Sequence, residues 1–276
     1  MATNLRQISL CLISIVTLGL PPVGLGAVEF ASAKPAERVD YWQQRQQEIT
    51  KELKERKDLA AVRLVFLGDS ITDFWHLGDN PWAPNQKCGR AIWDESFAGR
   101  PAENLALNLG ISGDRLEHVL HRLLPQSAGG LGELDAPGLK PDFVILMIGA
   151  NNSFLSEEPI ADSIFAGICA VITAVHERQP QTRIILQSLL PTYDEAKNRD
   201  AMRPVNQRMA ELAATAPYVG YVDYLDLYSA FVDSTGKQLG QHFNDGLHPS
   251  ETGYRVWRDR LVPFIARCRA SHSLPH

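Results

Sequence analysis

The chain has 276 residues, of which 45% are hydrophobic and 21% are charged, and these are the proportions of a globular protein. That length can form one large α/β domain or two small ones. The formal net charge of −5 argues against nucleic acid or an anionic membrane surface as the main partner.

The first residues have the composition of a secretory signal peptide. Residues 1–7 carry one cation and no acid, residues 8–20 form an apolar core, and small residues follow. The core is short for a membrane span, so a retained anchor is the alternative, and stable membrane insertion after cleavage is not expected. We predict a signal peptide over residues 1–27, with cleavage as late as residue 33, and a secreted or periplasmic protein.

The next segments lead to the first strand. Residues 28–37 are expected to be a tether, and residues 38–276 a single domain that opens with a surface helix within 39–59. The apolar run 62–67 predicts a buried strand, which stops abruptly at Gly68-Asp69-Ser70. A serine at this point is either a nucleophile at the carboxyl end of the strand or the cap of the next helix.

A long segment without a regular pattern follows at residues 74–100. Loops of this length often line a binding site. Trp82 and Trp93 within it are interpreted either as substrate platforms or as side chains that pin the loop to the core.

Strands alternate with helices along the rest of the chain. Further strands are expected at 104–109, 143–148, 184–189 and 221–225, and helices at 115–124, 160–178, 203–214 and 251–267. This alternation predicts a parallel sheet with helices on both faces. The loops after the first three strands must then meet at the carboxyl edge of that sheet, where open α/β sheets bind ligands.

The cysteines provide no disulfide framework. Cys11 lies in the predicted signal peptide, which leaves an odd number. Cys88 and Cys268 are a conceivable disulfide pair, and Cys169 is interpreted as a buried apolar residue.

Residues suited to acyl transfer occur in these loops. The reaction needs a nucleophile, a base, a group that orients the base, and donors for the oxyanion. Ser70 has the hydroxyl, and His248 is the best base because Asp245, three residues earlier, can accept its Nδ1–H across a turn. An isolated Asp-x-x-His pair also fits a surface turn, and His242 is a competing base without that spacing.

Oxyanion donors are expected from the backbone N–H groups of Ser70 and Gly113 and from the side-chain amide of Asn151. Glycine permits a close backbone approach, and an amide donates without carrying charge. The alternatives are a plain strand–helix turn for Gly113 and a helix cap for Asn151.

Four blocks of the sequence together resemble the GDSL or SGNH hydrolases. They are Gly68-Asp69-Ser70, Gly110 through Asp114, Gly149-Ala150-Asn151-Asn152 and Asp245-Gly246-Leu247-His248-Pro249. Ile71 replaces the leucine of the literal motif, and Ser112 replaces the usual central glycine of the second block. That block, continued by His118-Val119-Leu120 and Arg122-Leu123, looks closest to the catalytic subunits of platelet-activating-factor acetylhydrolases.

The resemblance implies a three-layer α/β/α flavodoxin-like fold with a five-stranded parallel sheet in the order 2-1-3-4-5, and no metal or cofactor. It implies that Ser70, Asp245 and His248 are catalytic and that Ser70, Gly113 and Asn151 form the oxyanion hole. We add Asp69, Trp82 and Trp93 as candidate substrate-binding residues.

These features predict an exported serine esterase that hydrolyses short-chain esters, especially acetyl esters, of glycans or small lipids through an acyl-enzyme. The acyl preference rests on the branch resemblance alone. A long-chain lipase or lysophospholipase, or a thioesterase of the same fold, is the alternative within the class. A non-catalytic flavodoxin-like binding module is the alternative of a different class, although the chain lacks a full Gly-x-Gly-x-x-Gly or P-loop signature.

Overall fold

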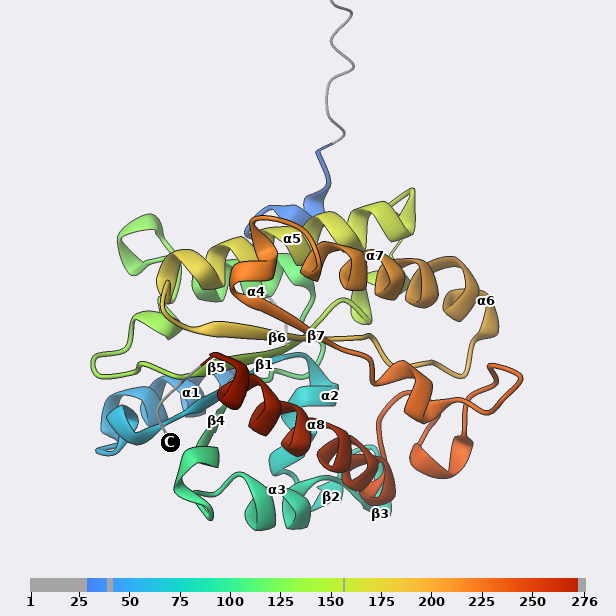
Figure 1. Ribbon diagram of the computed structural model, residues 1–276, viewed down its shortest axis with the longest axis horizontal. Helices are drawn as coiled ribbons and strands as arrows, with labels where there is room; N and C mark the ends of the chain where they lie inside the picture. Colours follow the sequence, from blue (N-terminus) through green and yellow to red (C-terminus); the bar gives the residue numbers. More distant parts are fainter. Residues whose placement is uncertain (1–28, 39–41, 156, 273–276) are drawn as a thin grey trace, which may run out of the picture.

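The computed structural model describes residues 29–38, 42–155 and 157–272, so the predicted signal peptide lies outside the described residues. At its centre is a parallel sheet of five strands (Figure 1). They are β1 (Leu64–Gly68), β4 (Ala106–Asn108), β5 (Phe143–Met147), β6 (Arg183–Gln187) and β7 (Val222–Leu225). Their order is β4-β1-β5-β6-β7, which is 2-1-3-4-5 when they are counted along the chain, the order that the family resemblance implies.

The central strands β1, β5 and β6 are buried along their whole length. A parallel sheet with both faces covered requires continuous apolar runs of this kind rather than an alternating pattern. The strand β1 begins two residues later than the run that predicts it, because the N–H of Val62 closes a turn onto the carbonyl of Leu59 at 3.1 Å.

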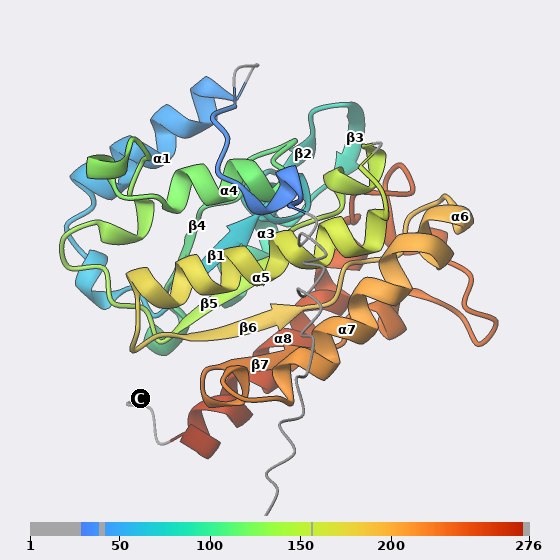
Figure 2. The same ribbon diagram turned by 90° about the horizontal axis from the view of Figure 1, so that it is seen from above.

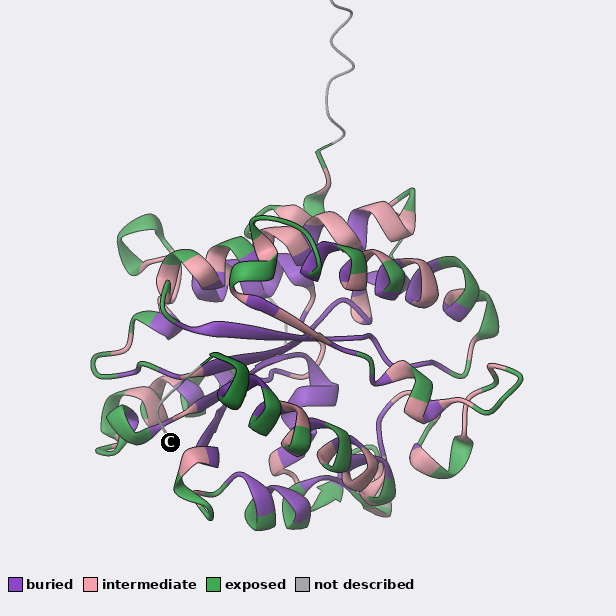
Figure 3. Cartoon of the chain, in the orientation of Figure 1, coloured by how far each residue is buried: buried purple, intermediate pink, exposed green. Residues whose placement is uncertain are grey.

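Helices form the two outer layers. The helices α4 (Leu116–Leu123), α5 (Ile160–Arg178) and α7 (Arg203–Ala213) cover one face, and α3 (Arg90–Ser96) and α8 (Glu251–His272) cover the other. A short α6 (Glu195–Lys197) and a π-helical turn precede α7. Figure 3 shows the buried strands between helices whose outward surfaces are exposed.

The helix α5 is long and apolar enough to cross a membrane by length and composition, with a hydropathy of 1.5. Its buried residues recur at helical spacing, among them Ile164, Ile168, Val171 and Val175. Because this face packs into the domain beside α4 and α7, we assign α5 as a core helix.

The helix α1 (Gln43–Glu55) lies along the edge of the sheet that β4 forms. Arg45 donates to the carbonyl of Asn108 at 2.8 Å, and Arg56 donates to the carbonyl of Ala106 at 3.3 Å. Both carbonyls belong to β4, so its unpaired edge is covered and not open to another strand.

The segment 74–100, predicted to be irregular, is largely structured. It contains the antiparallel hairpin of β2 (Asp79–Asn80) and β3 (Ala83–Lys87), followed by α3. The prediction is wrong because these elements are short: the helix α3 has seven residues, too few to show a clear period.

Residues 29–38, which we call the strap, pack against the domain, so the expectation of a free tether is wrong for them. A 3₁₀ turn at Ala31–Ala33 crosses α4 and α5 (Figure 2). Glu157 accepts the N–H of Ala31 at 2.7 Å, and the buried hydroxyl of Ser32 donates to the carbonyl of Ser163 at 2.7 Å. Partners this distant leave no signal in the local sequence.

The three cysteines in the described part of the chain are free thiols, so Cys88 and Cys268 do not form the conceivable disulfide. Both are buried, whereas Cys169, interpreted as buried, is only partly so.

Candidate active site

The turn between β1 and α2 (Ser70–Asp73) presents the candidate nucleophile. A Cβ on Gly68 would lie 2.2 Å from a carbonyl oxygen of β5, so only glycine fits this close approach. The carboxylate of Asp69 caps α2 by accepting the N–H of Ile71 at 2.9 Å. Ser70 is therefore the first residue of the helix and not its cap.

The loop before α8 folds tightly around Asp245. One carboxylate oxygen accepts the backbone N–H groups of Leu247 at 3.0 Å and His248 at 2.7 Å. The other carboxylate oxygen lies 2.7 Å from Nδ1 of His248. One side chain thus shapes the turn and orients the imidazole.

This turn brings the imidazole of His248 to the serine. Its Nε2 lies 2.9 Å from Oγ of Ser70, although the two residues are 178 positions apart in the chain. Phe74 stacks on the imidazole with ring centroids 4.9 Å apart, and Tyr254 of α8 donates its hydroxyl to the carbonyl of Ile71 at 2.8 Å. These contacts fix the histidine loop and α8 against α2.

Burial and hydrogen bonding set the charges of the two carboxyl groups beside the serine. Burial alone would raise the pKa of Asp245, but hydrogen bonds from the side chain and backbone of His248 outweigh it and lower that pKa to about 2. Burial raises the pKa of Asp69 to about 7, against the hydrogen bond from Ile71. At neutral pH, Asp245 therefore carries a full negative charge next to the imidazole.

The three candidate oxyanion donors follow β1, β4 and β5 at one edge of the sheet. Gly113 has a φ of 82°, a conformation that residues with side chains rarely adopt. Within the described ranges, no protein atom accepts the N–H of Ser70 or of Gly113. The amide of Asn151 donates to the carbonyl of Asp114 at 2.7 Å, which leaves its second N–H for another acceptor.

Asn151 is not a helix cap, so this alternative from the sequence analysis is wrong. It lies inside a 3₁₀ turn, Asn151–Phe154, whose cap position is Ala150. Its neighbour Asn152 caps instead, because its side-chain oxygen accepts the N–H of Leu116 at 3.1 Å, at the start of α4.

Trp82 is the candidate platform that lies beside the histidine. It occupies the tip of the β2–β3 hairpin and is 55% exposed. Its ring centroid is 5.1 Å from that of His248 and 5.2 Å from that of Phe74.

Three other candidates lie elsewhere. Trp93 packs in the core, with its ring centroid 5.0 Å from that of Phe66, so the interpretation as a substrate platform is wrong and the core interpretation describes it. Asp69 is 1% exposed and is occupied as a cap, so its side chain is not at a surface that a substrate could touch. The competing base His242 packs edge-on against Phe231.

A buried ion network that the sequence analysis did not predict lies behind residues 110–115, which we call the oxyanion loop. Arg122 of α4 donates to Asp114 at 2.5 Å and to Glu133 at 2.8 Å. Arg38 of the strap donates to Asp114 at 3.1 Å. Burial raises the pKa of Asp114 to about 6 although both guanidinium groups lower it, so its carboxylate is ionised at neutral pH.

Asp73, the last residue of α2, joins the nucleophile's helix to the oxyanion loop. Its Oδ2 accepts the N–H of Ser112 at 3.0 Å and the hydroxyl of Ser112 at 2.7 Å. Ser112 is the residue that departs from the glycine of the resembling family, and its hydroxyl makes a contact that glycine lacks.

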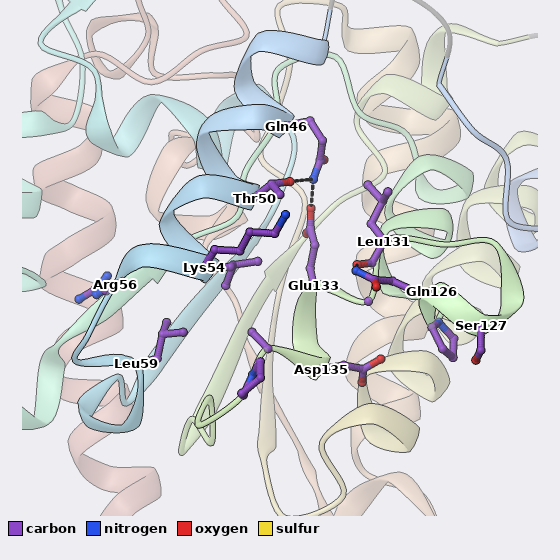
Figure 4. Close-up of a pocket in the computed structure, with 15 residues that line it drawn as sticks. Gln46, Thr50, Lys54, Arg56, Leu59, Gln126, Ser127, Leu131, Glu133 and Asp135 are labelled. Carbon is purple, nitrogen blue, oxygen red and sulfur yellow. Dashed lines mark hydrogen bonds between the residues drawn. The ribbon is translucent and has the colours of Figure 1, made fainter.

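A pocket of about 720 Å³ lies away from the serine, between α1 and residues 125–137 (Figure 4). On its wall Gln46 donates to Glu133 at 2.7 Å. None of Ser70, Asp245 and His248 lines this pocket. Among the described residues, no group of three His, Cys, Asp or Glu side chains is arranged to hold a metal ion.

A known family has the same sequence pattern. The sequence model of the GDSL-like lipase/acylhydrolase family matches residues 66–256, more than half of the chain. The chain belongs to this family. Among curated proteins, the platelet-activating factor acetylhydrolase IB subunit alpha1 of Pongo abelii is 34% identical over 213 residues, which are 76% of this GDSL hydrolase and 74% of the relative.

Solved structures share the fold of this GDSL hydrolase. A GDSL-like lipase from Bacteroides thetaiotaomicron has a TM-score of 0.56 at 19% identity, covering 82% of this chain and 98% of the other. A carbohydrate esterase family 3 protein from Talaromyces cellulolyticus has a TM-score of 0.52 at 18% identity, covering 76% and 99%. At these identities the likeness shows the fold alone, and family membership makes the chain a carboxylic ester hydrolase.

Proposed function

We propose that this GDSL hydrolase is an exported serine esterase that cleaves short-chain esters, above all acetyl esters, through an acyl-enzyme. The observation that carries the proposal is the hydrogen-bonded chain from Ser70 through His248 to Asp245, with contacts of 2.9 and 2.7 Å. A nucleophile within reach of a base, and a base oriented by a third group, are what acyl transfer needs.

In the first half of the proposed reaction, Oγ of Ser70 attacks the ester carbonyl carbon while Nε2 of His248 takes the hydroxyl proton. The tetrahedral intermediate then breaks its bond to the leaving oxygen, the imidazolium protonates that oxygen, and the alcohol departs. In the second half, water gives a proton to Nε2 and attacks the acyl carbon. The imidazolium returns the proton to Oγ as the carboxylic acid leaves.

The charge of each tetrahedral intermediate falls on the former carbonyl oxygen. In the proposed geometry this oxygen accepts from the N–H of Ser70, the N–H of Gly113 and the amide of Asn151. Loss of one such donor typically lowers kcat by about 10²- to 10³-fold. We therefore expect a loss of that size for Asn151→Ala.

A small-molecule or glycan acetyl ester is the proposed substrate. The curated relative is named an acetylhydrolase, and one solved neighbour is named a carbohydrate esterase. The exposed ring of Trp82 beside His248 offers a flat apolar surface on which a sugar ring can pack. A long-chain ester is the second candidate, because Phe154 and Leu155, 47% and 39% exposed, follow shortly after Asn151.

Export is proposed from the signal-like composition of residues 1–27. The strap bears on where cleavage would occur. Cleavage after residue 27 keeps the strap whole, whereas cleavage after residue 33 would remove Ser32 and its bond of 2.7 Å to Ser163. We therefore favour residue 27, and N-terminal sequencing of the exported protein tests this choice.

Replacement of the nucleophile tests the reaction. We expect Ser70→Ala to lose hydrolysis of p-nitrophenyl acetate by at least about 10³-fold, with an unchanged thermal unfolding midpoint and no labelling by a fluorophosphonate. Ser271→Ala, which removes an exposed serine hydroxyl of α8, is the matched control and should keep full turnover. Retained turnover in Ser70→Ala would refute the nucleophile, and a folded wild type that neither hydrolyses esters nor reacts with the fluorophosphonate would refute the esterase.

A series of acyl chains from acetyl to palmitoyl on one leaving group tests the proposed preference. We expect kcat/KM to be highest for acetyl. A maximum at palmitoyl would assign the protein to the long-chain alternative.

A further inference from the structure

The peptide between Ser112 and Gly113 is held from outside the catalytic loops. A guanidinium nitrogen of Arg38 donates to the carbonyl oxygen of Ser112 at 2.7 Å. The same nitrogen donates to the carboxylate of Asp114 at 3.1 Å. Arg38 thus forms hydrogen bonds to the residues on both sides of Gly113.

That carbonyl belongs to the peptide group whose N–H is the proposed oxyanion donor. A peptide group is planar, and in a trans peptide the C=O and the N–H point in opposite directions. The described cis peptide bonds lie elsewhere in the chain. Because Arg38 fixes the direction of the Ser112 carbonyl, it also fixes the direction of the Gly113 N–H.

The hydrogen bond from a cation has a second effect on the same group. A charged donor on the carbonyl oxygen polarises the peptide and strengthens the N–H as a donor. Arg38 is 5% exposed, so water screens this interaction little.

We propose that Arg38 is a positioning residue, which acts through the Ser112–Gly113 peptide to aim and strengthen the Gly113 N–H in the oxyanion hole. The inference rests on the proposed function of that hole. Arg38 lies in the strap, outside residues 66–256, over which the family model matches this chain.

Arg38 can be removed without dismantling the loop. Asp114 keeps its bond of 2.5 Å to Arg122, and Ser112 keeps its bonds of 3.0 and 2.7 Å to Asp73. The loop therefore keeps contacts on two sides, and we expect a substitution at Arg38 to loosen the Ser112–Gly113 peptide without unfolding the loop.

The experiment compares Arg38→Gln, Arg38→Lys and the wild type in full-length protein. We expect Arg38→Gln to lower kcat for p-nitrophenyl acetate by about 10- to 100-fold, because small misplacements of a catalytic group have effects of this size. KM should stay within about twofold. Arg38→Lys keeps a charged donor and should recover part of kcat. The control is Lys34→Gln, which removes an exposed strap cation paired with Glu29 at 2.5 Å and should leave kcat unchanged.

Hydrogen exchange of the backbone amides in residues 110–115 gives a second readout that does not depend on turnover. We expect faster exchange in Arg38→Gln than in the wild type and in Lys34→Gln. An unchanged kcat in Arg38→Gln, or unchanged exchange in this loop, would overturn the proposal. If the wild type hydrolyses no ester, the proposed function fails, and the exchange comparison still decides whether Arg38 orders the loop.

Discussion

At the scale of single residues, Asp245 combines two tasks in one carboxylate. Its Oδ1 shapes the turn through two backbone N–H groups, and its Oδ2 faces the imidazole at 2.7 Å. The two tasks can be separated, because an amide oxygen accepts backbone N–H groups as a carboxylate does, whereas an amide nitrogen cannot accept from Nδ1–H.

We expect Asp245→Asn to keep the turn and lose catalysis. The amide would favour the wrong tautomer of His248, with a loss of about 10⁴-fold in kcat and little change in thermal unfolding. Steady-state kinetics with p-nitrophenyl acetate measures the loss. The control is Asp233→Asn, since Asp233 also shapes a turn, by accepting the N–H groups of Thr235 and Lys237 at 2.8 and 3.1 Å, but orients no imidazole. Full activity in Asp245→Asn would contradict the orienting role.

The pH dependence follows from the charge of the same residue. The pKa of Asp245 is lowered from 3.8 to about 2, so this carboxylate contributes to stability above pH 3.8 and that contribution is lost as the pH falls through 2. Above pH 4 it stays ionised, and we expect kcat/KM to rise with pH, because only a base without its proton can take the proton of the nucleophile.

The pH–rate profile of Asp69→Asn is the control for this rise in kcat/KM. Burial raises the pKa of Asp69 to about 7, so Asp69 changes charge within the pH range of the profile. The amide can still cap α2. We expect kcat/KM still to rise with pH in this variant. Loss of the rise would assign it to Asp69.

At the scale of elements, the β2–β3 hairpin and α3 each carry a tryptophan, one exposed and one buried. Trp82 at the hairpin tip is 55% exposed beside the imidazole, whereas Trp93 in α3 is 9% exposed among core aromatic rings. The two substitutions should therefore affect different properties.

For Trp82→Ala we expect KM for an acetylated glycan to rise by about tenfold, because a packed aromatic surface is lost. The thermal unfolding midpoint should not move, since the ring is largely in water. An unchanged KM for glycan and small acetyl esters alike would remove Trp82 from the substrate site.

For Trp93→Ala we expect the free energy of unfolding to fall by about 3–5 kcal/mol, the effect of emptying a large core position. Urea denaturation measures it. Activity per folded molecule should be retained. A rise in KM without any loss of stability would restore the interpretation of Trp93 as a substrate platform.

At the scale of the whole molecule, the network of Arg38, Arg122, Asp114 and Glu133 joins the strap, α4 and two loops in the interior. These four side chains are at most 5% exposed. Removing Arg122, which pairs with both Asp114 and Glu133, would leave these two carboxylates buried without full compensation.

We expect Arg122→Ala to lower the free energy of unfolding by about 3–5 kcal/mol, because Asp114 and Glu133 would lose their shared partner. Chemical denaturation at neutral pH measures the change. The comparison is Arg199→Ala, whose exposed ion pair with Asp200 at 2.6 Å should contribute less than about 1 kcal/mol. Equal effects from the two variants would show that the buried network has no special weight in stability.

The sequence by itself determined the sheet and the composition of the site. Apolar runs such as 143–148 alternate with helical periods, and this alternation permits few arrangements other than a parallel sheet. Because parallel strands end at one edge, the loops with Ser70, Gly113 and Asn151 had to be neighbours. The turn from Asp245 to His248 could also be predicted, since a carboxylate three residues from an imidazole is a local arrangement.

Only the tertiary structure decided the contacts between distant segments. The distance of 2.9 Å between Ser70 and His248 depends on the packing of α8 against α2. The exposed position of Trp82 and the buried position of Trp93 depend on short elements without a period of their own. The bond from Arg38 to Ser112 spans 74 positions, between a segment with no apolar pattern and a loop held by polar contacts. Local sequence encodes hydrophobic period and turn geometry, but a polar partner far along the chain is specified only when the chain has folded.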